Sequence, residues 1–177
     1  LFPYTTLFRS NETGFEGSIL HVLMHGFTKC GLFLVAGAII YKTGKTRVDE
    51  LRGIGKEMPV LIWCYTILSI TLIGIPPTGG LASKWYLCKG ALESEIAVFD
   101  ILGPVILIIS ALLTAGYLLP LSINGFLPGD DYDYKALSVK EPNPTMIIPV
   151  IILTIGAVAV GIFSSPIVSV VENILGN

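Results

Sequence analysis

Four long apolar stretches constrain the fold of this chain more than any other feature. They run over Ile19–Ile40, Pro59–Ile75, Ile101–Ile123 and Met146–Phe163, and the last three contain no charged residue. A helix needs about 17 to 25 apolar residues to cross the hydrocarbon core of a bilayer. Unbroken apolarity of this length is typical of helices rather than of barrel strands, in which polarity alternates. The sequence therefore predicts an all-α, polytopic bundle of transmembrane helices.

The composition excludes a water-soluble domain and a nucleic-acid binder. Of the 177 residues, 53% are hydrophobic and 14% are charged, and the mean hydropathy is +0.77. A soluble domain carries roughly 25% charged residues. With 11 basic and 13 acidic residues, the chain offers phosphate groups no excess of positive charge. The three cysteines, Cys30, Cys64 and Cys88, form no CxxC pair, and we interpret them as small buried hydrophobic residues.

The first ten residues, LFPYTTLFRS, are unlike the rest of the chain. They contain neither an initiating Met nor an apolar run of the kind found in signal peptides. The codons CTC TTT CCC TAC ACG ACG CTC TTC CGA TCT encode this segment, and that string resembles a sequencing-library adapter. We therefore expect residues 1–10 to be non-native, and the chain to be the C-terminal piece of a longer protein. A native amphipathic leader is the alternative.

Two charged connections between the spans predict which side of the membrane each one occupies. Tyr41–Met58 has five basic and three acidic residues, which favours the cytoplasmic side. Asn124–Pro144 has four acidic and two basic residues, which favours the outer side. These two assignments agree if Gly79–Glu95 crosses the membrane by itself. We therefore expect five crossings, one of them discontinuous, at 17–41, 58–75, 79–96, 98–122 and 145–165.

The alternative is a single broken crossing over residues 58–95, which would place both connections on the same side. In either case, we expect residues 11–165 to form the membrane domain. The tail, residues 166–177, has apolar side chains at helical spacing, at Ile167, Val168, Val171 and Ile174. This pattern predicts a short amphipathic helix that lies at the membrane interface.

The first span is the informative one, because it contains the titratable residues His21, His25 and Lys29. A spacing of four residues keeps them in a stripe about 80° wide on one helix face, along a line of about 12 Å. A charged lysine in the middle of a membrane helix costs roughly 2.5–3.5 kcal/mol, so Lys29 must face protein or water. Such a lysine can accept and release a proton, and histidines can pass that proton to their neighbours. We interpret the three residues as a proton relay.

Two other interpretations of His21 and His25 remain. A pair of histidines four residues apart on one helix face is common in zinc sites. However, the residues between them are Val, Leu and Met, and no carboxylate follows within the span to complete a ligand set. We therefore predict no metal site. The second alternative is that both are ordinary core histidines.

A helix break follows the second span. Pro76, Pro77, Gly79 and Gly80 interrupt the apolar sequence, and prolines and glycines end helices. A broken helix at membrane depth is tolerated where it lines a hydrated cavity or is buried in protein, and such breaks mark ion pathways. Lys84 follows the break directly, so we predict that it is a second proton-carrying site. The alternative is a lysine that extends to the membrane interface from the end of a short helix.

Four motifs in this sequence occur together in a known family. They are HxxxHxxxKxxLFxxxGxxxxxTG, LRGIGKEMP, GIPPTGGLASKWYL and SALLTAGYLLP. Together they resemble the second half of the proton-conducting antiporter-like membrane subunits, over about residues 16–165. That family includes the large membrane subunits of respiratory complex I, their relatives in membrane-bound hydrogenases, and the corresponding membrane subunit of multisubunit sodium/proton antiporters.

The resemblance implies an architecture and a set of roles. Family members have about fourteen membrane helices in two inverted five-helix repeats, each with a discontinuous helix, and this chain would supply helices ten to fourteen. Lys29 matches the central relay lysine, His21 and His25 the histidines beside it, and Lys84 the charged residue of the second discontinuous helix. One branch of the complex I subunits has glutamate at that last position, so a lysine points away from it.

The resemblance also implies what the chain does and does not bind. Redox chemistry in these complexes occurs in partner subunits, and this sequence has no GxGxxG loop, so we expect no active site and no cofactor. The expected function is proton translocation by an antiporter-like subunit of an NADH-quinone oxidoreductase or of a cation/proton antiporter complex. Expected partners are other membrane subunits, protons or Na⁺, and the lipid of a prokaryotic inner membrane. The rivals are a non-conducting scaffold and a membrane metalloenzyme.

Overall fold

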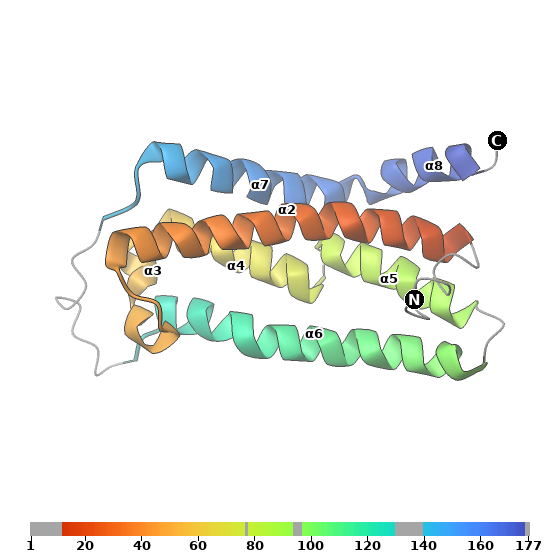
Figure 1. The fold of residues 1–177 in the computed structure, drawn as a ribbon, viewed down its shortest axis with the longest axis horizontal. Helices are drawn as coiled ribbons and strands as arrows, with labels where there is room; N and C mark the ends of the chain where they lie inside the picture. Colours follow the sequence, from red (N-terminus) through yellow and green to blue (C-terminus); the bar gives the residue numbers. More distant parts are fainter. Residues whose placement is uncertain (1–11, 77, 94–96, 130–139, 176–177) are drawn as a thin grey trace.

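The computed structural model describes residues 12–76, 78–93, 97–129 and 140–175, and none of these lies in a strand. In chain order the elements are α2 (Glu12–Thr43), the 3-10 helix η1 (Val48–Leu51), α3 (Ile54–Glu57), α4 (Pro59–Ile73), α5 (Gly79–Leu92), α6 (Ala97–Phe126), α7 (Pro144–Ile162) and α8 (Ser164–Leu175). The long helices lie side by side along one axis (Figure 1). The all-α prediction is confirmed. Residues 1–10 lie outside the described residues, so their non-native origin stays a prediction.

Three of these helices are long and apolar enough to cross a membrane by themselves. They are Thr13–Thr43 of α2, Asp100–Phe126 of α6, and α7. By contrast, α4 has 15 residues and α5 has 14. At 1.5 Å per residue each is roughly 21–23 Å long, whereas the hydrocarbon core is about 30 Å thick. The polytopic membrane bundle is confirmed, but neither α4 nor α5 can complete a crossing alone.

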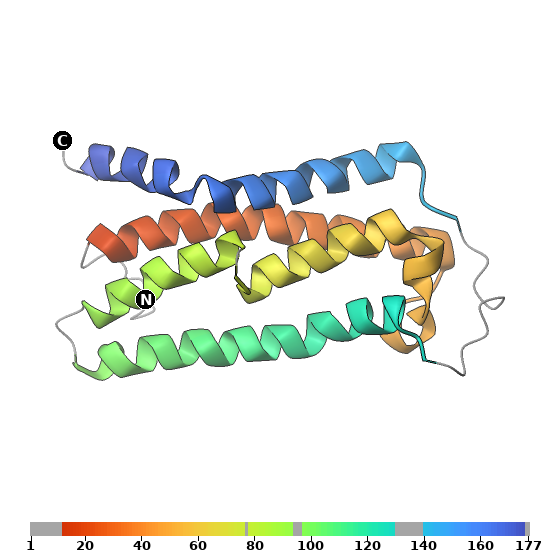
Figure 2. The same ribbon diagram turned by 180° about the vertical axis from the view of Figure 1, so that it is seen from behind.

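Instead, α4 and α5 lie end to end and together run the length of the bundle (Figure 2). The chain then returns along α6 and crosses again along α7. The discontinuous helix is therefore present as predicted, but the prediction that residues 79–96 cross by themselves is wrong. The alternative, a single broken crossing over residues 58–95, describes the structure. The described chain makes four crossings rather than five.

The connection that follows α2 and the one that follows α6 lie at the same end of the bundle, which we call the loop end. Here the Gly53 N–H donates to the Asn124 carbonyl oxygen over 2.9 Å, and the Arg52 guanidinium donates to the Pro128 carbonyl oxygen. The prediction that these two connections lie on opposite sides of the membrane is therefore wrong. It failed because it assumed that the segment after the break crosses the membrane separately.

The core lies between α2, α4, α6 and α7. Its fully buried side chains include Val35, Leu61, Ile62, Leu68 and Val150. Lipid tails are as apolar as these side chains, so association of membrane helices depends on van der Waals packing and on hydrogen bonds between helices. The structure contains both kinds of contact.

Hydrogen bonds join α4 to α6 and to the segment before α7. The Tyr65 hydroxyl donates to the Leu118 carbonyl oxygen over 3.1 Å, and the hydroxyl oxygens of Thr66 and Ser122 are 2.9 Å apart. At the loop end, the first turn of α4 donates from the Val60 N–H to Glu141 Oε1 over 2.7 Å. These bonds fix the position of α4 against its neighbours.

α8 follows α7 after an interruption at Phe163 and continues in the same general direction (Figures 1 and 2). Its side chains Val168 and Val171 are buried, whereas Val170 is 58% exposed. An apolar groove between α8 and α2 is lined by Ile19 of α2, among others. The amphipathic helix predicted for the tail is thus present, and its location at a membrane interface stays a prediction.

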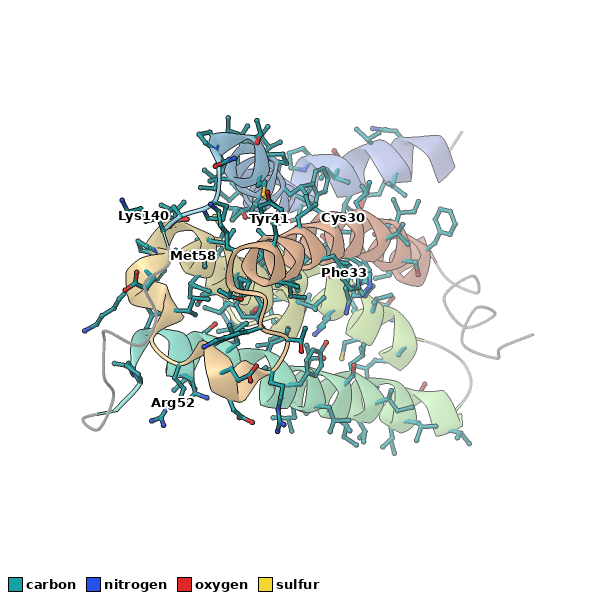
Figure 3. All side chains as sticks on the ribbon, turned by 60° about the vertical axis from the view of Figure 1, so that its left-hand side comes forward. Cys30, Phe33, Tyr41, Arg52, Met58 and Lys140 are labelled. Carbon is teal, nitrogen blue, oxygen red and sulfur yellow. The ribbon has the colours of Figure 1, made fainter. Side chains whose placement is uncertain are left out.

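One face of α2 is not covered by the other described helices. Phe33 is 74% exposed and Tyr41 71% exposed, and Cys30 on the same helix is also exposed (Figure 3). Lys29, next to Cys30, is half-buried. A membrane protein leaves such apolar side chains to contact lipid or other protein.

Candidate functional site

The break between α4 and α5 is stabilised by local hydrogen bonds. After Ile73, Gly74 adopts a φ of +86°, which favours glycine, and its N–H donates to the Ile70 carbonyl oxygen over 3.0 Å. The Thr78 hydroxyl donates to the Ile75 carbonyl oxygen over 2.7 Å. The backbone thus ends one helix and starts the next within a few residues.

The predicted break residues occupy two different positions. Pro76 lies in the unwound segment, and Pro77 lies outside the described residues. Gly79 and Gly80 are instead the first two residues of α5. A Cβ atom on Gly80 would overlap the carbonyl oxygen of Thr71 in the last turn of α4. The glycine is therefore needed for the two helix ends to approach each other.

Lys84 binds the end of the preceding helix. Its Nζ donates to the Leu72 carbonyl oxygen over 3.1 Å and to the Ile73 carbonyl oxygen over 2.6 Å. The last carbonyls of a helix have no partner within that helix and carry partial negative charge. The carbonyl oxygens of Leu72 and Ile73 therefore accept hydrogen bonds from the Lys84 amine at the break itself. The break lies in the middle of the α4–α5 crossing and not at either end of it.

His21 on α2 contacts α5. His21 Nδ1 and Ser83 Oγ are 3.1 Å apart, and Ser83 Oγ also lies 3.2 Å from the Gly80 carbonyl oxygen. The rings of His21 and His25 have centroids 5.6 Å apart and are tilted by 38°. Ser83 is not among the residues predicted from the sequence. Its position, immediately before Lys84 and one turn after the break, was the available indication.

A small polar cavity lies where α2, α4 and α5 meet. Its volume is about 10 Å³, which approaches the space that one water molecule needs. The Thr71 hydroxyl is buried and has no hydrogen-bond partner in the structure. The polar side chains that line the cavity are those of His21, His25, Thr28, Thr71, Ser83 and Lys84.

Lys29 lies at the other end of the predicted relay. His25 and His21 follow Lys29 at intervals of four residues toward the start of α2, and His21 contacts Ser83, the neighbour of Lys84. The order of the groups is therefore Lys29, His25, His21, Lys84. The structure brings His21, His25 and Lys84 to one cavity, whereas Lys29 does not line it.

A second, larger space adjoins Lys84 on the side of α6. Its volume is about 300 Å³, and from α5 it is lined by Lys84, Trp85 and Cys88. The α6 residues that line it are all apolar: Pro104, Leu107, Ile108 and Ala111. The Lys84 side chain therefore separates the polar cavity on the α2 side from an apolar pocket on the α6 side.

Lys89 has different surroundings from Lys84. Its Nζ lies 3.6 Å from Glu93 Oε1, and the side chains of the two residues are 56% and 44% exposed. Exposed pairs of this kind contribute little to stability, and Lys89 lines neither space beside the break.

The potential metal ligands at this site are too few to form a metal centre among the described residues. Within the described residues, no group of three or more His, Cys, Asp or Glu side chains could hold a metal ion. Cys64 is buried, as predicted for a small hydrophobic residue, but Cys30 is exposed on α2 and Cys88 is half-buried.

Comparison with known families decides which kind of membrane protein this is. The model of the family described as "NADH:quinone oxidoreductase/Mrp antiporter, TM" matches residues 4–118, well over half of the chain. The chain belongs to this family. The membership predicted from the four motifs is therefore confirmed, and the chain is an antiporter-like membrane subunit of the complex I family.

Curated relatives in this family come from several kinds of organism. The chain is 35% identical over 171 residues to NADH-quinone oxidoreductase subunit N of Desulforudis audaxviator, covering 90% of this chain and 33% of the relative. It is 29% identical over 164 residues to F(420)H(2) dehydrogenase subunit N of Methanosarcina mazei, covering 86% and 31%. It is 28% identical to the chloroplast NAD(P)H-quinone oxidoreductase chain 4 of Capsella bursa-pastoris, covering 94% and 34%. The chain thus spans about a third of the length of these relatives.

Solved structures share the fold. A chain in the Mrp complex from Dietzia sp. DQ12-45-1b superposes with a TM-score of 0.73 at 19% identity, over 91% of this chain and 37% of that one. A chain of the archaeal membrane-bound sulfane sulfur reductase superposes with a TM-score of 0.69 at 24% identity, over 84% and 24%. The chain therefore shares this arrangement of helices with parts of both solved structures.

Proposed function

We propose that this chain carries protons across the membrane as part of a longer antiporter-like subunit. The observation that supports the proposal best is the series of titratable groups that runs from Lys29 through His25 and His21 to Lys84. Three of its members line one polar cavity at a helix break. A non-conducting scaffold has no need for such a series.

Each group in the series can perform one step. An imidazole accepts a proton on one ring nitrogen and releases one from the other, so His25 and His21 can pass a proton along α2. From His21, the proton moves through the cavity that Ser83 and Lys84 also line. There the Lys84 amine takes it up as an ammonium.

The end of α4 makes a protonated Lys84 tolerable inside the membrane. An ammonium in hydrocarbon is costly unless it pairs with carbonyl oxygens or water. The carbonyl oxygens of Leu72 and Ile73 provide that pairing through the two hydrogen bonds from Nζ. Lys84 can therefore hold a proton at mid-membrane until a water molecule on the outward side accepts it.

The charges of the connections orient the path. The two connections at the loop end contain seven Lys and Arg residues, whereas residues 93–96 at the opposite end contain none. Lys and Arg in short loops favour the cytoplasmic side, and acidic residues count for little. The loop end therefore faces the cytoplasm, and the connection between α5 and α6 faces outward.

The whole protein works in a complex with other membrane subunits. Relatives carry the names of NADH-quinone oxidoreductase, F(420)H(2) dehydrogenase and Mrp complex components. We place this chain in the prokaryotic cell membrane, as a subunit of a redox-driven quinone reductase or of a cation/proton antiporter. It needs no cofactor of its own, because every group in the proposed path is an amino-acid side chain.

Replacing Lys84 and Lys89 separately by Met in the full-length subunit, within its complex, tests the proposal. The variants remove the same charge from the same helix, but only Lys84 lies on the path. We expect Lys84→Met to abolish most proton movement into inverted membrane vesicles, measured with a pH-sensitive dye, and Lys89→Met to leave it nearly unchanged. Equal effects, or a larger loss at Lys89, would assign the function elsewhere. Undiminished transport in both variants would favour the scaffold.

A further inference from the structure

A second interruption of the backbone lies against the break between α4 and α5. α7 ends at Ile162 and α8 begins at Ser164. In the last turn of α7, Gly161 contacts Gly79, the first residue of α5. A Cβ atom on Gly161 would lie 2.5 Å from Gly79 N and 2.6 Å from Gly79 Cα. No side chain fits between the two backbones.

The first turn of α5 is therefore held from two sides. On one side Gly79 meets α7 through Gly161. On the other side, Gly80 meets α4, because a Cβ atom there would overlap the Thr71 carbonyl oxygen and lie 3.2 Å from Gly74 Cα. Backbone-to-backbone contacts have no flexible side chain that could absorb a change. Any atom added between α7 and α5 must displace the start of α5.

Displacement of α5 would change the contacts of Lys84, five residues further along the same helix. Its Nζ is now 2.6 and 3.1 Å from the two carbonyl oxygens that end α4. A movement of about 1 Å relative to α4, in either direction, is large compared with the range of distances over which a hydrogen bond is useful. We propose that Gly161 is a positioning residue: its contact with Gly79 holds the Lys84 amine against the end of α4. For its transport readout, this inference rests on the proposed function.

The chain supplies two matched controls. A Cβ atom on Gly156, also in α7, would lie 2.7 Å from two ring carbons of Phe27 on α2. Gly156→Ala therefore adds the same methyl group to the same helix away from the break, but against a side chain rather than against a backbone. Gly116 on α6 has nothing within 4 Å of the position of its Cβ atom, so Gly116→Ala tests a glycine replacement without any overlap.

The pH dependence of proton movement depends on the titratable groups that face Lys84. From α2 these are His21 and His25, and from its own helix Cys88 lines the pocket beside it. From α6 only apolar side chains line that pocket, and α7 contains no titratable residue. Lys84 and Cys88 lie on α5, whose first residue Gly161 contacts, and His21 contacts α5 through Ser83. A changed pH profile in a Gly161 variant would therefore report on the position of α5, and the structure of the variant identifies the part of Lys84.

The experiment compares Gly161→Ala, Gly156→Ala and Gly116→Ala in the full-length subunit within its complex. For Gly161→Ala we expect proton movement per assembled complex to fall about tenfold, and the pH profile to be displaced by about one unit. In a solved structure of this variant, the distances from Lys84 Nζ to the two carbonyl oxygens should differ from the present 3.1 and 2.6 Å. Both control variants should keep the wild-type pH profile, even if Gly156→Ala lowers the amount of complex.

Unchanged Lys84 distances and an unchanged pH profile in Gly161→Ala would overturn the inference, whatever the transport rate. If Gly161→Ala does not assemble although Gly156→Ala and Gly116→Ala do, the contact holds the helices together rather than positioning Lys84, and the inference is overturned as well. The proposed function fails separately, if Lys84→Met transports normally, and the distances in the variant structures test the positioning role independently of transport.

Discussion

At the scale of single residues, the site depends on backbone as much as on charged side chains. Lys84 is held by two carbonyl oxygens, and Ser83 lies within hydrogen-bond distance of both the His21 ring and the Gly80 carbonyl. The titratable residues were predictable from the sequence, because charged groups are rare in membrane helices and their spacing on α2 is helical. Ser83 was not, because a serine is common in membrane helices and only the packing of α5 on α2 turns it toward His21.

Ser83→Ala should slow proton transfer between α2 and Lys84. The substitution removes the hydroxyl that contacts His21 and leaves the imidazole with one contact fewer in the cavity. We expect transport per assembled complex to fall severalfold, while stability changes by only about 0.6 kcal/mol, as is usual for hydrogen bonds between membrane helices. Vesicle acidification measures the first quantity, and thermal unfolding in detergent the second.

Ser18→Ala is the control for this prediction. The Ser18 hydroxyl, on the same helix as His21, donates to the Gly14 carbonyl oxygen of its own helix, over 2.7 Å. Its loss should leave transport close to that of the wild type. Equal rates in Ser83→Ala and the wild type would show that the proton does not need the Ser83 hydroxyl.

At the scale of helices, the break was predictable but its consequence was not. Prolines and glycines indicated where the helix would end. The charges of the connections predict that residues 79–96 cross the membrane by themselves. This prediction is wrong, because the length of a helix decides whether it can cross. With 14 residues α5 is too short, so it completes the crossing that α4 begins. The contact between α5 and α7 could not be predicted, because a glycine in an apolar helix does not reveal which neighbour approaches it.

Gly80→Ala should destabilise the junction of α4 and α5. The added methyl group would overlap the Thr71 carbonyl oxygen, and backbone shifts that relieve overpacking cost about 1–3 kcal/mol. Gly116→Ala adds the same methyl group in open space and should be neutral or stabilising by up to about 1 kcal/mol. Thermal unfolding of the full-length subunit in detergent compares the two variants. Equal midpoint temperatures of unfolding would mean that the junction accommodates the added methyl group without cost.

At the scale of the whole molecule, the described helices form an incomplete site. Lys29 lies on α2 beside the exposed residues Cys30 and Phe33, and the chain spans about a third of its relatives. That the chain is the C-terminal part of a longer subunit stays a prediction from the resemblance. The described helices make four membrane crossings rather than the expected five, because α4 and α5 lie end to end in one crossing. Only the structure shows this.

The 177-residue chain alone should conduct no protons. Proton entry to Lys29 requires protein or water on the face of α2 that the described helices leave uncovered, and lipid cannot provide it. In reconstituted vesicles with a pH-sensitive dye, proton flux should equal that of protein-free vesicles. Flux above that level which disappears in Lys29→Met would show that these helices form a complete path.

The hydrogen bonds at the loop end involve the connections as well as the helices. Arg52 and Gly53 join the segment before α4 to the end of α6, and Glu141 joins the first turn of α4 to the segment before α7. The start of the α4–α5 crossing is thereby fixed to two other parts of the chain. A force from a neighbouring protein cannot separate α4 from α6 at this end without first breaking these bonds, so the residues between the helices help to keep the interrupted crossing in its place.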